Sequence, residues 1–209
     1  MKCNICVVTD DKLSNGLSHV EIAKLSYEGG ADIVQLRVKD NDPRFLDWAV
    51  TISQISRSFG KLFIVNDNID IALLSGADGV HVGQSDMSVR QIRELVPENF
   101  IIGVSVGNVE EAVTAEKDGA SYVSLSPVFD TLSKLDVGRG KGIEMLKTIR
   151  KFVKIPLIAI GGIKKENVAS VINAGADGVS VISAVVSQRN IPAAVEEIRR
   201  IIKATKGRL

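Results

Sequence analysis

The feature of this chain that most constrains its fold is a regular alternation between two apolar patterns. Short continuous aliphatic runs of strand length alternate with longer segments of helical period. The runs are Ile5–Val8, Ile33–Leu36, Leu62–Val65, Gly79–Val82, Phe100–Val104, Tyr122–Leu125, Pro156–Ile160 and Gly178–Ile182. The helical candidates cover residues near 17–28, 43–58, 68–75, 88–96, 108–118, 142–152, 165–173 and 191–204. Aliphatic strands that are each followed by a helix predict a parallel sheet buried on both faces.

A repeated tripeptide narrows this α/β pattern to one architecture. Gly-Ala-Asp, or Gly-Ala-Ser in one copy, ends a helix and opens a strand at Gly30, Gly76, Gly119 and Gly175. These sites precede the second, fourth, sixth and eighth predicted strands, so the chain repeats in units of two strand–helix pairs. Glycine at each site suits a left-handed helix end. We therefore predict a (β/α)8 TIM barrel that forms a single domain over residues 1–209, in preference to an open doubly wound sheet.

The charge balance and the lengths of the apolar runs argue against several classes of partner. With 26 basic and 25 acidic residues the net charge is +1, which gives no broad field for nucleic acid or an anionic membrane. No apolar run approaches the roughly 20 residues of a membrane span, and the first eleven residues lack the pattern of a signal peptide. We expect a cytoplasmic protein. The sequence leaves the oligomeric state open, with a homo-oligomer as one option.

The two cysteines, Cys3 and Cys6, have a spacing that also occurs in redox and zinc motifs. No second cysteine pair completes a metal site. Both lie in an apolar run typical of a strand, where residues three apart point to opposite faces. We interpret them as buried structural residues.

Basic side chains follow the second predicted strand, at the end where barrels of this kind place their active sites. Gln35, Arg37 and Lys39 share one face at the strand period of two. Because the opposite, apolar face must pack on the helices, we expect the charged face to point into the barrel mouth. The alternative is an exposed edge strand, which a closed barrel does not have. Arg and Lys gathered in a pocket suit a phosphate or diphosphate.

Acidic residues follow the next two predicted strands. Asn66 and Asp67 end the third strand, and Asp86 follows the fourth. Two carboxylates together with phosphate oxygens match the ligands that Mg²⁺ prefers. The alternative for either aspartate is capping of the helix that follows it. Asp70 fits a first-turn helix acid, and His81 either lines the barrel or is a hydrogen-bonded core histidine.

A second anion site is predicted at the ends of the seventh and eighth strands. Gly161 and Gly162 follow the seventh strand, and Ile182 and Ser183 follow the eighth, where a short extra helix fits. Barrels often bind phosphate here through backbone N–H groups, so we expect this region to be neutral. Ser105 ends the fifth strand, and a long loop after the sixth, residues 130–141, holds Thr131, Ser133 and Lys134. Two anion regions at one mouth predict two phosphorylated substrates.

These segments together resemble the thiamine phosphate synthase family. The resemblance covers nearly the whole chain, and the segment from Gly79 to Met87 is its most specific part. The matching segments are residues 35–39, 65–67 with 70–73, 79–87, 103–105, 127–129, 161–163 and 181–184.

The resemblance implies an enzyme that joins hydroxymethylpyrimidine diphosphate to a thiazole phosphate, releasing pyrophosphate with Mg²⁺. It assigns Mg²⁺ to Asp67 and Asp86, and a direct part in catalysis to Arg37, Lys39, Ser105 and Lys134. It implies that the pyrimidine diphosphate is bound by Gln35, Arg37, Lys39, Asn66, Ser105 and Lys134. It implies that the thiazole phosphate is bound by Thr131, Ser133, Gly161, Gly162, Ile182 and Ser183.

The chain departs from the family pattern in two places. Asp130 and Ser133 stand where the family usually has proline and threonine, and Val106-Gly107 stands where Thr-His is common. Two alternatives follow, a thiazole tautomerase of the same superfamily and a non-catalytic phosphate-binding barrel. The paired aspartates favour the synthase over both.

Overall fold

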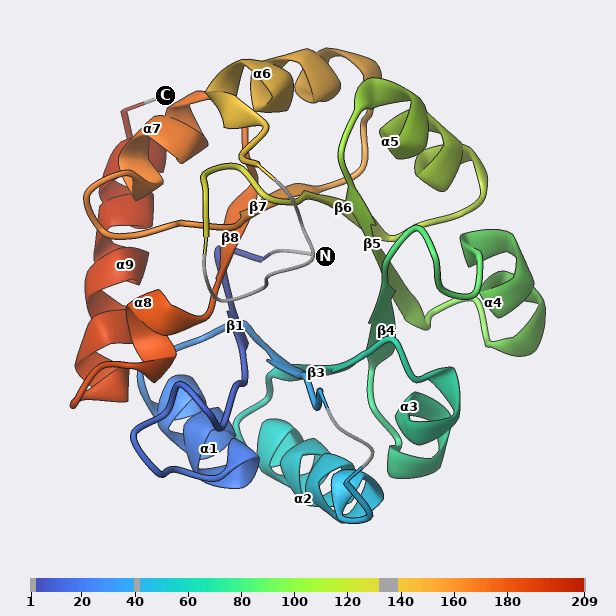
Figure 1. Ribbon diagram of the computed structural model, residues 1–209, viewed down its shortest axis with the longest axis vertical. Helices are drawn as coiled ribbons and strands as arrows, with labels where there is room; N and C mark the ends of the chain where they lie inside the picture. The colour runs from blue at the N-terminus through green and yellow to red at the C-terminus, as the bar shows by residue number, and fades with distance from the viewer. Residues whose placement is uncertain (1–2, 40–41, 132–138, 209) are drawn as a thin grey trace.

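In the computed structural model, which describes residues 3–39, 42–131 and 139–208, the chain closes into a barrel of parallel strands surrounded by helices (Figure 1). The strands follow one another around the barrel in chain order, and β1 pairs with β8 to close it. The predicted (β/α)8 barrel is confirmed.

The elements alternate as the sequence predicts. The strands are β1 (Ile5–Val8), β2 (Ile33–Leu36), β3 (Leu62–Asn66), β4 (Gly79–Val82), β5 (Ile101–Val106), β6 (Tyr122–Leu125), β7 (Leu157–Ile160) and β8 (Gly178–Val181). The helices are α1 (His19–Glu28), α2 (Phe45–Ser58), α3 (Ile69–Ser75), α4 (Val89–Leu95), α5 (Val109–Lys117), α6 (Gly142–Phe152), α7 (Val168–Asn173), α8 (Ser183–Val186) and α9 (Ile191–Lys206). Within the described residues, none of the helices combines the length and apolar character needed to cross a bilayer.

Helix α7 differs most from its predicted range, because it begins at Val168 and not near residue 165. The side chain of Asn167 accounts for the delay. Its Oδ1 accepts from the Lys164 N–H at 2.8 Å, and its Nδ2 donates to the Gly162 carbonyl at 2.9 Å. The residues before α7 therefore form a braced turn beside the glycine pair.

Alternation along the strands divides the core into two layers. Val34, Leu36 and Phe63 pack outward in the large cluster between sheet and helices. The residues between them point into the barrel, where a second cluster contains Cys3, Cys6, Val8, Ile33, Ile64, Tyr122 and Ile158. Gln35 follows the inward series and is 4% exposed, which places it inside the barrel as predicted.

Both cysteines are buried, free thiols, as the structural interpretation requires. Their expected separation onto opposite faces is wrong, because both belong to the inner cluster. Strand β1 starts only at Ile5, so Cys3 lies before it and does not follow its alternation. Burial raises the pKa of the Cys6 thiol to about 12 and raises the pKa of Cys3 as well, which makes both poor nucleophiles.

The repeated tripeptide has two structural roles at the end of the barrel where the strands start. Its glycines have φ between 67° and 100°, the left-handed conformation expected after a helix. Its third residue accepts a hydrogen bond from the backbone of the preceding strand or the residue before it. Asp32 accepts from Asn4 at 2.8 Å, Asp78 from Phe63 at 2.8 Å, Ser121 from Ile102 at 3.0 Å and Asp177 from Leu157 at 2.8 Å. The repeat thus joins the strands in pairs.

We expect Asp78→Ala to destabilise the fold by about 1–3 kcal/mol, because the buried Phe63 N–H loses its carboxylate partner. Asp78→Asn keeps an oxygen acceptor and should cost clearly less. Urea unfolding of the two variants and the wild type measures the difference. Equal stability of Asp78→Ala and wild type would show that the aspartate of this tripeptide does not stabilise the fold.

Candidate active site

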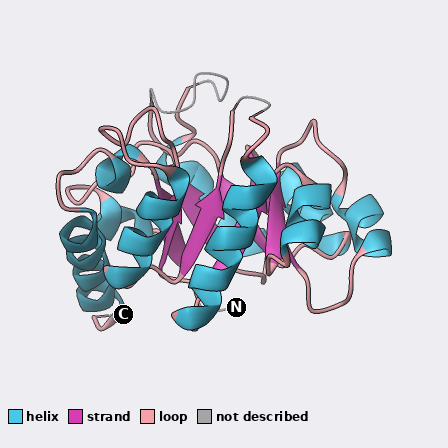
Figure 2. Cartoon of the chain, turned by 90° about the horizontal axis from the view of Figure 1, so that it is seen from below, coloured by secondary structure: helices cyan, strands magenta, loops and turns pink. Residues whose placement is uncertain are grey.

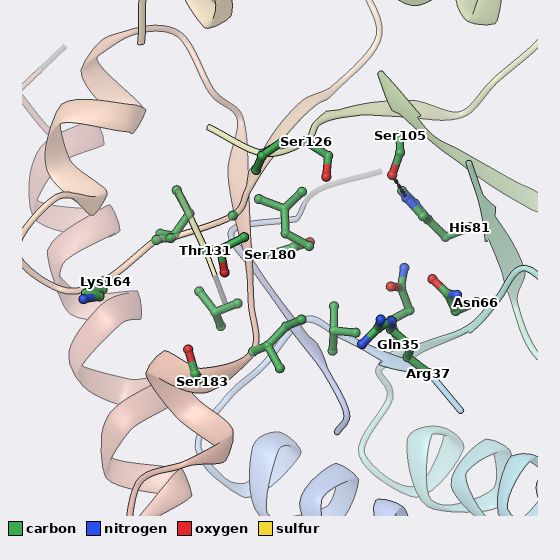
Figure 3. A pocket seen from close by; sticks show the side chains of 18 residues that line it. Gln35, Arg37, Asn66, His81, Ser105, Ser126, Thr131, Lys164, Ser180 and Ser183 are labelled. Carbon is green, nitrogen blue, oxygen red and sulfur yellow. Dashed lines mark hydrogen bonds between the residues drawn. The ribbon is translucent and has the colours of Figure 1, made fainter. Parts of the chain in front are cut away.

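All the strands run toward the same end of the barrel (Figure 2), and a cavity opens at that end (Figure 3). Residues from most of the strand ends contribute to its lining. Those predicted from the sequence are Gln35, Arg37, Asn66, Ser105, Thr131, Gly161, Gly162, Ile182 and Ser183. Those that the sequence analysis did not single out include Ser126, Lys164 and Ser180. Ser133 and Lys134 lie outside the described residues.

The basic end of β2 lies against an acid that the sequence analysis missed. Asp10, two residues after β1, is 2% exposed. Its Oδ2 lies 3.4 Å from Arg37 Nη1 and 3.0 Å from Lys39 Nζ. Arg37 lines the cavity beside Gln35 and Asn66 (Figure 3). Lys39 forms an ion pair with Asp10 and is not among the residues that line the cavity. The signal that was overlooked is the polar pair Thr9-Asp10 directly after an apolar strand.

Asp67 and Asp86 line a neighbouring hollow, together with Glu111 and Lys141. Ser105 and Ser126 line both this hollow and the main cavity. The capping alternative for both aspartates is wrong. The N-cap of α3 is Asn68, and α4 is capped by Ser88 in a capping box with Gln91. Asp70 lies in the first turn of α3, as predicted.

The backbone of Asp67 has a conformation unusual for a residue with a side chain. Its φ is 63°, in the left-handed region, which aspartate tolerates better than most residues. Its N–H donates to the carbonyl of His81 at 2.8 Å, so pairing between β3 and β4 continues through the turn. The turn places the carboxylate in the same hollow as Asp86, whose Oδ2 accepts from the Gly83 N–H at 2.6 Å.

The donor set in this hollow suits a hard cation that the substrate helps to bind. Among the described residues, no group of three or more His, Cys, Asp or Glu side chains could hold a metal by itself. Two carboxylates suffice for Mg²⁺ when phosphate oxygens and water complete its coordination.

His81 meets both of its predicted alternatives, because it lines the cavity and is also buried with partners for both ring nitrogens. Nδ1 lies 2.8 Å from the Tyr122 hydroxyl, and Nε2 lies 2.9 Å from Ser105 Oγ. Burial raises the pKa of Tyr122 well above its usual value, so the phenol stays protonated. The chain Tyr122–His81–Ser105 therefore runs from the inner core to the cavity, and it fixes the hydroxyl of Ser105.

The glycine pair after β7 is needed for packing as well as for any ligand. Gly161 and Gly162 have φ values of 96° and 63°. A Cβ on Gly162 would lie 2.8 Å from Phe129 Cβ, and one on Gly161 would lie 2.4 Å from Pro127 Cβ. The loops after β6 and β7 can thus approach each other only with glycine here. The expectation that this region is neutral is wrong, because Lys164 also lines the cavity.

The structure describes the surroundings of Asp130 and Gly107, one residue from each departure from the family pattern. Asp130 Oδ1 accepts from the Gly140 N–H at 2.8 Å, which holds together the two ends of the loop between them. A Cβ on Gly107 would lie 3.4 Å from Lys141 Cε. The end of the Lys141 side chain thus lies close to the space that a side chain at position 107 would enter.

The model of the family described as thiamine monophosphate synthase matches residues 5–185. The chain belongs to this family. It is 50% identical over 208 residues to a thiamine-phosphate synthase of Methanoculleus marisnigri, covering 99% of both chains. It is 43% identical over 201 residues to one of Chloroflexus aurantiacus, covering 96% of this chain and 93% of that protein.

Solved structures agree with the family assignment. A thiamine phosphate pyrophosphorylase from Pyrococcus furiosus is 40% identical, with a TM-score of 0.90 over 98% of this chain and 97% of that one. A 3-hexulose-6-phosphate synthase, 19% identical with a TM-score of 0.70, shares the fold. The resemblance inferred from the motifs is confirmed. The chain is a transferase of the thiamine-phosphate synthase class, and neither the tautomerase nor the non-catalytic alternative is favoured.

We expect Tyr122→Phe to lower stability by about 1–2 kcal/mol, because the buried His81 Nδ1 loses its partner. The ring remains, so packing against the inner cluster should be retained. Thermal or urea unfolding measures the loss. If Tyr122→Phe is as stable as wild type, the bond to His81 does not support the site.

Proposed function

We propose that residues 1–209 form one catalytic domain that binds a pyrimidine diphosphate on the β2–β4 side of the mouth. A thiazole phosphate binds on the β7–β8 side. The observation that carries this proposal is the convergence of Arg37, the paired aspartates and the β7–β8 loops around adjoining cavities that share Ser105 and Ser126. A transferase that joins two phosphorylated molecules needs both anion regions within reach of one reacting centre.

On the pyrimidine side, Gln35, Asn66 and Ser105 present polar groups toward the cavity. Arg37 and Lys39 supply the positive charge for the diphosphate, and Lys134 is proposed to add to it. The amide groups of Gln35 and Asn66 are suited to the ring nitrogens and amine of an aminopyrimidine, since each amide both donates and accepts.

On the thiazole side, the phosphate would rest on the backbone after β7 and β8. Gly161, Gly162, Ile182 and Ser183 line that part of the cavity, with Thr131 beside them. Ser133 is proposed to join them. Backbone N–H groups and hydroxyls are common phosphate ligands in barrels of this class.

The residues present fit Mg²⁺ at Asp67 and Asp86. When bound, the ion supplies positive charge that neutralises the departing diphosphate. The proposed reaction is dissociative. The C–O bond breaks, diphosphate leaves with the electron pair, and the thiazole nitrogen donates its lone pair to the resulting pyrimidinylmethyl cation. The protein residues contribute charge stabilisation and orientation, and no protein nucleophile is needed.

Activity should depend on a divalent cation and on both aspartates. We expect Asp67→Asn and Asp86→Asn each to lower kcat by at least about tenfold while leaving the fold intact. The measurement is pyrophosphate release with Mg²⁺ titrated into metal-free enzyme. Full turnover in excess EDTA would contradict the metal proposal and would favour a tautomerase-like activity.

The two subsites should respond to different substitutions. Arg37→Ala should raise KM for the pyrimidine diphosphate on the order of 10- to 100-fold, since a charge-assisted hydrogen bond is lost. Ser183→Ala should raise KM for the thiazole phosphate by about 3- to 10-fold, as expected for a neutral one. Ser183 is a cleaner probe than Gly162, where any side chain also meets Phe129. If both variants raise the KM of the same substrate equally, the assignment of two subsites is wrong.

A further inference from the structure

The arrangement around Asp10 is unusual for a carboxylate. Asp10 is 2% exposed, whereas Arg37 is 12% exposed and Lys39 is 36% exposed. The acid therefore lies beneath the two cations and not among surface charges. Burying a carboxylate is costly unless it is paired and hydrogen-bonded, and Asp10 is both.

The contacts of Asp10 divide between its two oxygens. Oδ1 accepts from the backbone N–H of Leu13 at 3.1 Å. This bond holds the carboxylate against the loop after β1. Oδ2 faces both cations, at 3.4 Å from Arg37 Nη1 and 3.0 Å from Lys39 Nζ. Arg37 is also held through its main chain, because its N–H donates to Thr9 Oγ1 at 3.2 Å.

This geometry leaves donors available on both cations. A guanidinium has five N–H donors and an ammonium has three. Asp10 Oδ2 faces Arg37 through Nη1 alone and faces the single ammonium of Lys39, so further N–H donors remain on both side chains. Without the acid, two positive side chains on alternate residues of one strand end would repel each other and spread into solvent. With it, they stay side by side with a combined charge of +1 for the three groups.

We infer that Asp10 is a positioning residue that pre-organises Arg37 and Lys39 for a diphosphate group. The inference rests on the proposed function, because it assumes that these cations meet a diphosphate. A scaffold role accounts less well for the contacts. Helix α1 is capped by Ser18 in a capping box with Glu21, so Asp10 is not needed as its cap.

The neighbouring residue provides a matched control. Asp11 is 52% exposed on its side chain and lies 3.8 Å from His19 Nε2. Asp10→Asn and Asp11→Asn remove the same charge from adjacent positions. Only the first removes it from the two cations, and its amide oxygen can still accept from Leu13.

The test is calorimetric titration of inorganic pyrophosphate with Mg²⁺, together with steady-state kinetics on both substrates. Asp10→Asn should weaken pyrophosphate binding and raise KM for the pyrimidine diphosphate by about tenfold or more. KM for the thiazole phosphate should stay within about twofold, a separation that general destabilisation would not produce. Asp11→Asn should leave all three constants within about twofold of wild type. Equal effects of the two variants overturn the inference.

A double-mutant cycle tests whether Asp10 acts through its partners. Lys39→Met removes one cation, so Asp10→Asn should have a smaller effect in that background than in wild type. Strict additivity overturns the inference. If Asp10→Asn does not fold, Asp10→Glu takes its place. It keeps the charge but displaces it by one methylene, and unchanged pyrophosphate binding would again overturn the inference.

The outcomes also separate this inference from the proposed function. A wild-type enzyme that makes no thiamine phosphate from the two substrates would contradict the proposed function. The pyrophosphate titration does not depend on turnover, so it would still decide whether Asp10 orders the cations.

Discussion

The structure depends on how the starts of its strands are held together. In parallel sheets the ladder alone does not fix where each strand begins, and a shift of one residue would exchange the inner and outer faces. The third residue of each glycine-alanine tripeptide settles this by accepting from a backbone N–H within one residue of the start of the preceding strand. Because the inward series then includes Gln35 and His81, the polar groups of the site follow from contacts at the opposite end of the barrel.

The fold could be predicted largely because its signals are local and repeated. The aliphatic runs, the helical segments and the fourfold tripeptide each depend on residues close in sequence, and the strands lie within a few residues of their predicted bounds. The two exceptions have local causes. Asn167 delays α7, and the start of β1 at Ile5 leaves Cys3 outside the strand alternation.

The candidate site was only partly predictable. Polar residues at strand ends were found because the fold makes that position informative, and the conformation of Asp67 then explains why it is not a helix cap. Asp10 and Lys164 were missed, since a single charged residue after an apolar run does not show which distant side chain it meets. The contact of Asp10 with Arg37, 27 residues away, depends on the pairing of β1 with β2.

The closure between β1 and β8 has a consequence for following the molecule in solution. Cys6 pairs with Ser180 across this seam, and a Cβ on Gly178 would lie 2.2 Å from the carbonyl oxygen of Cys3. Both thiols, the only two in the chain, are buried where its first and last strands meet. A thiol reagent can therefore label the protein only when the packing around these thiols opens. The native chain thus carries its own reporter for opening of this part of the barrel, without any introduced probe.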